Sequence, residues 1–143
     1  MSTAADGKNL EINPGWEYFA KYTFAPAILR DGFLFISGMT ASGADGGLLC
    51  PGDLAGQTDV ILKRLGEILA AAGCGYDDVV ATREFITVTD DYRKTADVRR
   101  KYFKPPFPAA TGVIVAGLLR PGALIEIEAI AALPGGRRWH SDS

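Results

Sequence analysis

Hydrophobic and polar positions follow two different periods along this chain, and the changes of period mark the expected elements. Between residues 28 and 37, two short apolar runs flank a turn at Arg30-Asp31-Gly32, which predicts a hairpin that ends at Ser37. From Asp53 to Ala72, apolar residues recur every three or four positions instead, which predicts a helix that stops at Gly73. The charged residues of this helix fall on its opposite side and are expected to face solvent: Asp59, Lys63, Arg64 and Glu67.

The second half of the chain repeats this change of period. A run rich in β-branched residues over 79–88 predicts a strand, and the segment 91–103 predicts a second helix, broken by the prolines that follow at 105, 106 and 108. Two closing strands are expected at 112–118 and 124–133, joined by a turn at 120–122.

The resulting order is strand, strand, helix, strand, helix, strand, strand, which is typical of an α+β fold. We expect a mixed sheet with the two helices packed on one face, and a homo-oligomer that covers the other face. With 143 residues, 48% of them hydrophobic, the chain is long enough for one core. We therefore predict a single domain over 1–143, with a core at about 20–133 and flexible ends at 1–13 and 134–143.

Composition excludes several classes of function. The 15 basic and 17 acidic residues nearly balance, which argues against binding to nucleic acid. The longest apolar run, 113–119, is far shorter than the roughly 20 residues of a membrane span, and the polar N-terminus does not resemble a signal peptide. The two cysteines lack metal-site spacing and His140 lies in the tail, so we expect no metal, no cofactor and a cytoplasmic location.

The last predicted strand carries the best candidate for chemistry. Strand alternation places Glu126 and Glu128 on one face, with apolar neighbours on the other. Such acids either pair with lysine or arginine, or act as a general acid or base whose pKa the apolar surroundings raise. We choose Glu126 for the catalytic role, although the pattern alone does not separate the two glutamates.

Other candidate segments lie at the ends of strands and before the first predicted strand. Ser37, Gly38 and Met39 leave one strand, while Ala110, Thr111 and Gly112 lead into another, and backbone amides in such loops often face ligands. An aromatic run precedes the first of these strands, and we interpret it as core packing or a subunit seam rather than a substrate box: Trp16, Tyr18, Phe19, Tyr22 and Phe24.

Taken together, these landmarks resemble the reactive-intermediate deaminase family, known as Rid, YjgF or L-PSP, over about residues 20–133. The ordered set carries the resemblance: Ala25-Pro26-Ala27, Phe35-Ile36-Ser37-Gly38, Gln57, Leu69 to Gly73, Asp78-Val79-Val80, Phe85, Tyr92, Tyr102-Phe103, Phe107-Pro108-Ala109 and Ile125 to Ala129.

The resemblance implies a chorismate-mutase-like fold and a homotrimer with clefts between subunits. It also implies cofactor-free hydrolysis of enamines and imines, with the glutamate at 126 positioning water. Three positions depart from the family pattern. Ala110 stands where an arginine usually grips the substrate carboxylate, Gly112 replaces a common cysteine, and Phe24 replaces a tyrosine. Another cation must then enter the cleft, with Arg120 and Arg83 as candidates, or the substrate differs.

The leading hypothesis is therefore a deaminase of a small imine, enamine or related unsaturated intermediate, which binds the ligand around Phe24, Gly38, Gly112 and Arg120. A trimeric metabolite-binding or regulatory protein that has lost this activity is the alternative. Ribonuclease activity, reported for some members of the family, is the least favoured of the three.

Overall fold

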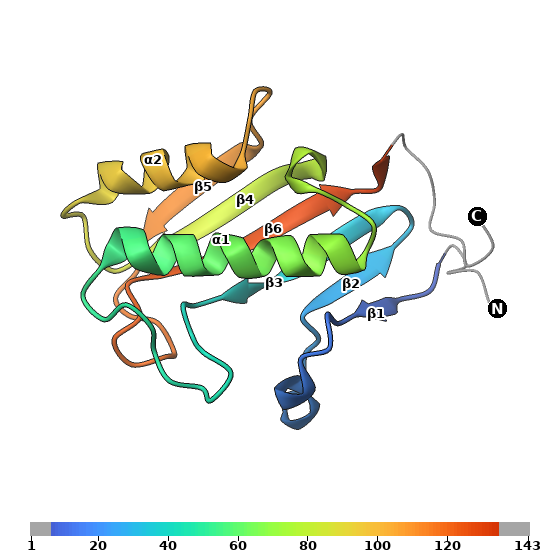
Figure 1. The fold of residues 1–143 in the computed structure, drawn as a ribbon, viewed down its shortest axis with the longest axis horizontal. Helices are drawn as coiled ribbons and strands as arrows, with labels where there is room; N and C mark the ends of the chain where they lie inside the picture. Colours follow the sequence, from blue (N-terminus) through green and yellow to red (C-terminus); the bar gives the residue numbers. More distant parts are fainter. Residues whose placement is uncertain (1–6, 135–143) are drawn as a thin grey trace.

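The computed structural model describes residues 7–134, which form one six-stranded sheet and two α-helices (Figure 1). The strands are β1 (Leu10–Ile12), β2 (Ala27–Arg30), β3 (Phe33–Met39), β4 (Val79–Ile86), β5 (Ala109–Ile114) and β6 (Ile125–Ala132). The helices are α1 (Leu54–Ala71) and α2 (Tyr92–Tyr102), with short 3-10 turns η1 (Glu17–Lys21) and η2 (Tyr76–Asp78).

The sheet is mixed, in the order β1-β2-β3-β6-β4-β5, as the α+β prediction required. β4 and β5 are parallel, and every other neighbouring pair is antiparallel. The β2–β3 hairpin turns where predicted, because Asp31 and Gly32 both adopt positive φ angles, of 52° and 84°.

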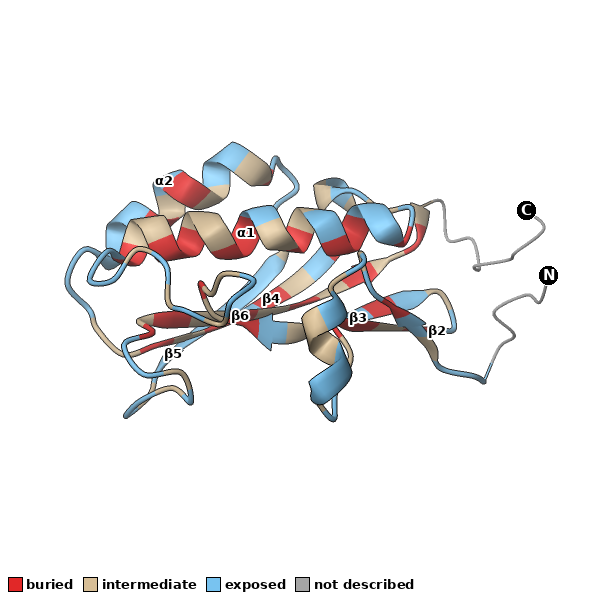
Figure 2. Cartoon of the chain, turned by 60° about the horizontal axis from the view of Figure 1, so that its bottom comes forward, coloured by how far each residue is buried: buried red, intermediate tan, exposed pale blue. Residues whose placement is uncertain are grey.

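Both helices pack on the same face of the sheet, and Figure 2 shows α1 and α2 together above the strands. α1 begins at its N-cap Asp53, whose carboxylate accepts a bond from the Gly56 amide, and the chain leaves it through Gly73 at φ 75°. Its buried stripe includes Gln57, whose amide oxygen accepts a bond from the Leu124 amide at 2.9 Å. This contact ties the start of the helix to the segment that leads into β6.

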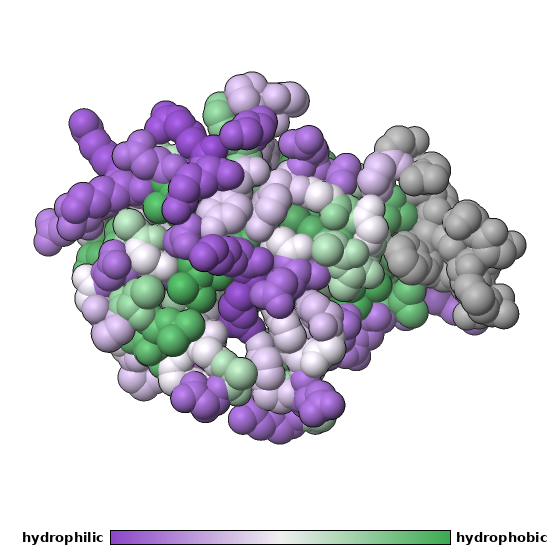
Figure 3. Space-filling view, in the orientation of Figure 1, coloured by the Kyte–Doolittle hydropathy of each residue, from purple (hydrophilic) through white to green (hydrophobic). Residues whose placement is uncertain are grey.

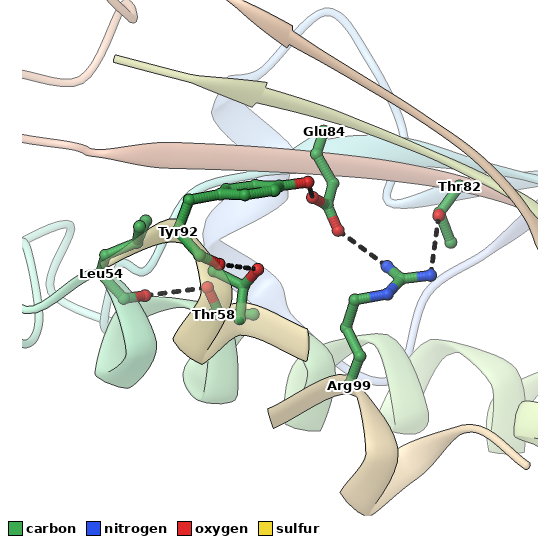
Figure 4. A network of polar contacts seen from close by, with 7 residues as sticks. Leu54, Thr58, Thr82, Glu84, Tyr92 and Arg99 are labelled. Atoms are coloured by element: carbon green, nitrogen blue, oxygen red, sulfur yellow. Dashed lines mark hydrogen bonds and ion pairs between the residues drawn. The ribbon is translucent and has the colours of Figure 1, made fainter. Parts of the chain in front are cut away.

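α2 has a polar outer surface, where hydrophilic side chains gather in Figure 3, and is fastened to the sheet by a buried polar network (Figure 4). The Arg99 guanidinium lies 2.8 Å from the Glu84 carboxylate on β4 and also donates to Thr82. The Tyr92 hydroxyl donates to the other oxygen of Glu84. Because Glu84 is almost fully buried, these partners are what allow it to remain in the core.

The sheet face opposite the helices is uncovered and partly apolar. Along β3, Leu34 and Ile36 are buried under the helices, so Phe33 and Phe35 point to the other face, where each is 46% exposed. Glu126 and Glu128 alternate with buried neighbours in the same way along β6 and share this open face.

The structure corrects a strand boundary, adds a strand and changes the placement of one side chain. β5 runs over 109–114 instead of 112–118, because it pairs in parallel with β4 from Ala109 onward. β1 was missed, although its three residues, Leu10–Ile12, pair with β2. Arg64 was placed on the solvent side of α1, whereas it is only partly exposed and bonds to two other segments.

Candidate active site in the cleft around Glu126

Only one of the two neighbouring glutamates on β6 is paired. Glu128 lies opposite Arg83 on β4, with its Oε2 atom 3.4 Å from the guanidinium. Within the part of the chain that the structure describes, Glu126 has no hydrogen bond or salt bridge. Glu128 therefore fits the interpretation of an acid that pairs with an arginine. Glu126 is the acid that is available for chemistry.

The Glu126 carboxylate lies against a glycine on the neighbouring strand. A Cβ atom added at Gly38 would stand 3.0 Å from Glu126 Oε2 and 3.2 Å from its Cδ. The register of β3 against β6 shifts between Ile36 and Met39, so the chain bulges at this point. The bulge and the missing side chain together make room for the carboxylate.

Burial raises the pKa of the Glu126 carboxyl above its ordinary value, and the negative charge of Glu128 raises it further. A paired cation would lower this pKa, but within residues 7–134 no lysine or arginine lies within salt-bridge distance of Glu126. A carboxyl group tuned in this direction exchanges protons closer to neutral pH, as a general acid or base requires.

Glu126 opens into a cleft of about 330 Å³ with an aromatic wall. Four members of the aromatic run line it: Tyr18, Phe19, Tyr22 and Phe24. The ring of Phe24 is 54% exposed and stacks on Tyr22 with their centroids 5.1 Å apart. These rings therefore line the cleft that contains Glu126, and their roles as a subunit seam or a substrate box both stay predictions.

Arg120, which the sequence analysis selected as a substrate-binding residue, lines the same cleft, and its role stays a prediction. Its Nε atom donates to Thr40 Oγ1 at 3.1 Å, and its Nη1 atom donates to the Gly46 carbonyl. These bonds hold the guanidinium beside the loop that follows β3. Arg83, the other candidate, is engaged with Glu128 and does not line this cleft.

Arg64 also lines this cleft, although it was not among the site residues predicted from the sequence. It reaches the cleft from α1, donating to the Ser42 carbonyl at 3.2 Å and to the Tyr18 hydroxyl. Its guanidinium also lies 4.6 Å from the ring centroid of Trp16, a cation–π distance. The aromatic run preceding β2 was the available signal, since an arginine is a common partner for such rings.

The remaining predicted residues separate into two groups. Met39 lines the cleft, and the neighbouring Ser37 directs its hydroxyl to the Ala25 carbonyl at 2.6 Å, which fixes the segment before β2. Ala110, Thr111 and Gly112 lie on the edge strand β5, along hollows beside β6 and α2, and do not reach the Glu126 cleft of their own chain. Their role in substrate binding stays a prediction.

The surroundings of Cys74 disfavour it as a nucleophile. Cys50 and Cys74 are unbridged, and burial, with a further contribution from Asp78, raises the pKa of the Cys74 thiol to about 11. Among residues 7–134, no group of three or more acidic, histidine or cysteine side chains is arranged to hold a metal ion. His140 lies outside the described residues. The candidate chemistry therefore belongs to Glu126.

Comparison with known proteins identifies the family of this chain. Residues 17–133 match the model of a family described as Endoribonuclease L-PSP. The chain belongs to the L-PSP, or Rid, family. The human protein named 2-iminobutanoate/2-iminopropanoate deaminase is 37% identical to this Rid-family chain over 108 residues, which make up 76% of the chain and 78% of the human protein.

Solved structures share the fold of this Rid-family protein. The Rid protein YyfA from Yersinia pestis superimposes with a TM-score of 0.78 at 33% identity, covering 88% of this chain and all of the other. A protein from Thermotoga maritima described as a putative endoribonuclease gives 0.74, also at 33% identity, over 81% and 91% of the two chains. No helix among the described residues is long and apolar enough to cross a membrane.

Proposed function

We propose that this Rid-family protein hydrolyses a small imine, or the imine tautomer of an enamine, to a carbonyl compound and ammonia. The observation that carries the proposal is the unpaired Glu126 carboxyl, whose pKa is raised and which faces a cleft beside Gly38. The named activity of the human relative, a deaminase of two imino acids, supports this reaction class.

Glu126 serves first as a base and then as an acid in this reaction. Water held by the carboxylate attacks the carbon of the protonated C=N bond while Glu126 takes one proton from the water. The resulting carbinolamine receives that proton on nitrogen, the C–N bond breaks and ammonia leaves, while Glu126 takes the hydroxyl proton as that oxygen becomes the carbonyl, and the released ammonia then carries this proton away as ammonium. One water is consumed for each ammonia released, so no cofactor is needed.

A coupled ammonia-release assay tests the proposal. The substrates are freshly generated 2-aminoacrylate, 2-iminobutanoate and 2-aminomuconate, with the spontaneous rate subtracted. Glu126→Gln should lose about 100-fold or more in kcat, the contribution of a positioned general base. Glu128→Gln is the matched control two residues along the same strand, and it should keep its turnover.

The Glu128→Gln variant should also change how the rate depends on pH. Removing the Glu128 charge lowers the pKa of Glu126, so the acidic limb of its rate profile should move to lower pH. Undiminished ammonia release by Glu126→Gln on every accepted substrate would exclude this mechanism. Saturable binding without any product, in a correctly folded protein, would favour the alternative of a metabolite-binding or regulatory role.

We also propose a homotrimer as the working form, located in the cytoplasm. The uncovered sheet face with Phe33 and Phe35 needs a partner, because exposed apolar patches of this kind usually mark interfaces. In such an assembly a neighbouring subunit would bring Ala110, Thr111 and Gly112 to the Glu126 cleft. Light scattering in solution tests the trimer independently of any substrate.

A further inference from the structure

Two arginines face the same cleft, and neither is neutralised. Arg120 reaches it from the segment between β5 and β6, and Arg64 reaches it from α1. Both side chains are partly buried, and in residues 7–134 neither has an acidic partner within salt-bridge distance. Two guanidinium groups that line one cleft without acidic partners give it a positive potential, which favours an anionic ligand.

The charged groups of the cleft contact one segment of chain, residues 38–46. Glu126 lies against Gly38, Arg120 donates to Thr40 and to the Gly46 carbonyl, and Arg64 donates to the carbonyl of Ser42. The carboxyl group and both guanidinium groups therefore line the same cleft, within reach of one small ligand.

Both guanidinium groups keep donors for a ligand. Within residues 7–134, the hydrogen bonds of Arg120 use Nε and Nη1 and leave Nη2 for a ligand, while those of Arg64 use Nη1 and Nη2 and leave Nε. The bonds that exist, and the stacking of Arg64 on Trp16, fix both planar groups before a ligand arrives. An arginine preorganised in this way suits a carboxylate better than a flexible lysine does.

We propose that Arg64 and Arg120 form a two-point anion site and that the substrate is a small unsaturated dicarboxylate carrying the C=N group. This assignment rests on the proposed imine hydrolysis, because the protonated C=N group supplies the positive charge that faces Glu126. The two guanidinium groups are then left for two carboxylates, and every charge in the occupied cleft has a counterpart. A substrate with one carboxylate leaves one arginine unsatisfied.

The test uses two stable ligands that differ by one carboxylate. The trans,trans-muconate dianion and sorbate share the same diene chain, and sorbate has a methyl group where muconate has its second carboxylate. Isothermal titration calorimetry on the full chain should show muconate binding about tenfold or more tightly than sorbate, since a second charge-assisted pair is gained. Equal affinities would overturn the proposal.

Single substitutions then assign the difference to the two arginines. Arg64→Gln and Arg120→Gln should each reduce muconate affinity about tenfold, to the level of sorbate, while Arg100→Gln removes the same charge from an exposed position on α2 and should change nothing. The muconate-to-sorbate ratio is the decisive readout, because loss of structure weakens both ligands together. An undiminished ratio in both variants would also overturn the two-point site.

The binding measurement separates this inference from the proposed reaction. Muconate preference that depends on both arginines, without ammonia release from any imine, would retain the dianion site and reject the deaminase. Glu126-dependent ammonia release from an imino monoacid, with equal binding of muconate and sorbate, would retain the deaminase and reject the dicarboxylate substrate.

Discussion

The contact between Gly38 and Glu126 makes Gly38→Ala the most informative single substitution in this protein. The new methyl group would lie 3.0 Å from Oε2 of Glu126 and 3.2 Å from its Cδ and Cγ, closer than ordinary van der Waals contacts of 3.4–4 Å. The carboxylate must therefore move by a few tenths of an ångström. Since a misplacement of about 1 Å in a catalytic group costs about 100-fold, we expect kcat to fall about three- to tenfold.

Stability should not follow activity in this variant. Gly38 does not have a positive φ, so alanine meets no backbone strain, and it restricts the unfolded chain by about 0.5–1 kcal/mol relative to glycine. This gain offsets the cost of moving the carboxylate, so Tm should change little while kcat falls.

The assay is steady-state ammonia release together with thermal unfolding of the same samples. Gly75→Ala is the matched control, because nothing lies within 4 Å of an added Cβ there and its φ of −130° suits alanine. A Gly38→Ala enzyme with wild-type kcat would refute the inference that Glu126 works from its position against Gly38. A loss of Tm in step with kcat would instead indicate general damage to the sheet.

Three further outcomes are expected. Arg99→Met, which strands the buried Glu84 carboxylate, should cost about 3 kcal/mol of unfolding free energy in denaturant titrations, and adding Glu84→Leu should recover part of it; additive losses would contradict this. The raised pKa of Glu126 favours folding when the carboxyl is protonated, and this contribution is lost as pH rises through the folded-state pKa. Glu126→Gln should therefore exceed wild-type stability at pH 7 and lose that advantage below a pH of about 4.3, the ordinary carboxyl pKa. Phe35→Glu, on the open sheet face, should reduce the molar mass in light scattering to that of one chain, and an unchanged assembly would exclude this face as the interface.

The arrangement of the fold was accessible from the sequence because its elements have strong periods. The apolar stripe of α1 and the β-branched run of β4 are patterns of the local sequence, so they can be recognised without knowing the neighbours of either element. β1 and the start of β5 depend on a neighbour instead. β1 has only three residues and exists by pairing with β2, while β5 begins where its parallel pairing with β4 begins.

The candidate site was accessible only in part, for a related reason. Glu126 and Gly38 stood out because an acid in an apolar strand and a glycine after a strand are local signals. Arg64 did not stand out, since a charged residue on the polar side of a helix looks solvent-facing until another segment covers it. Here Tyr18 and Ser42, both more than 20 residues away in sequence, supply that cover.

The loop that follows β3 is held by the same two arginines that face the cleft. Arg64 bonds to the carbonyl of Ser42, and Arg120 bonds to Thr40 and to the carbonyl of Gly46. An anion bound by the remaining donors, Nη2 of Arg120 and Nε of Arg64, shares each guanidinium group with the loop. Ligand affinity and the position of the loop are therefore coupled through two side chains, since a ligand that draws a guanidinium group into the cleft also changes the bonds that hold the loop.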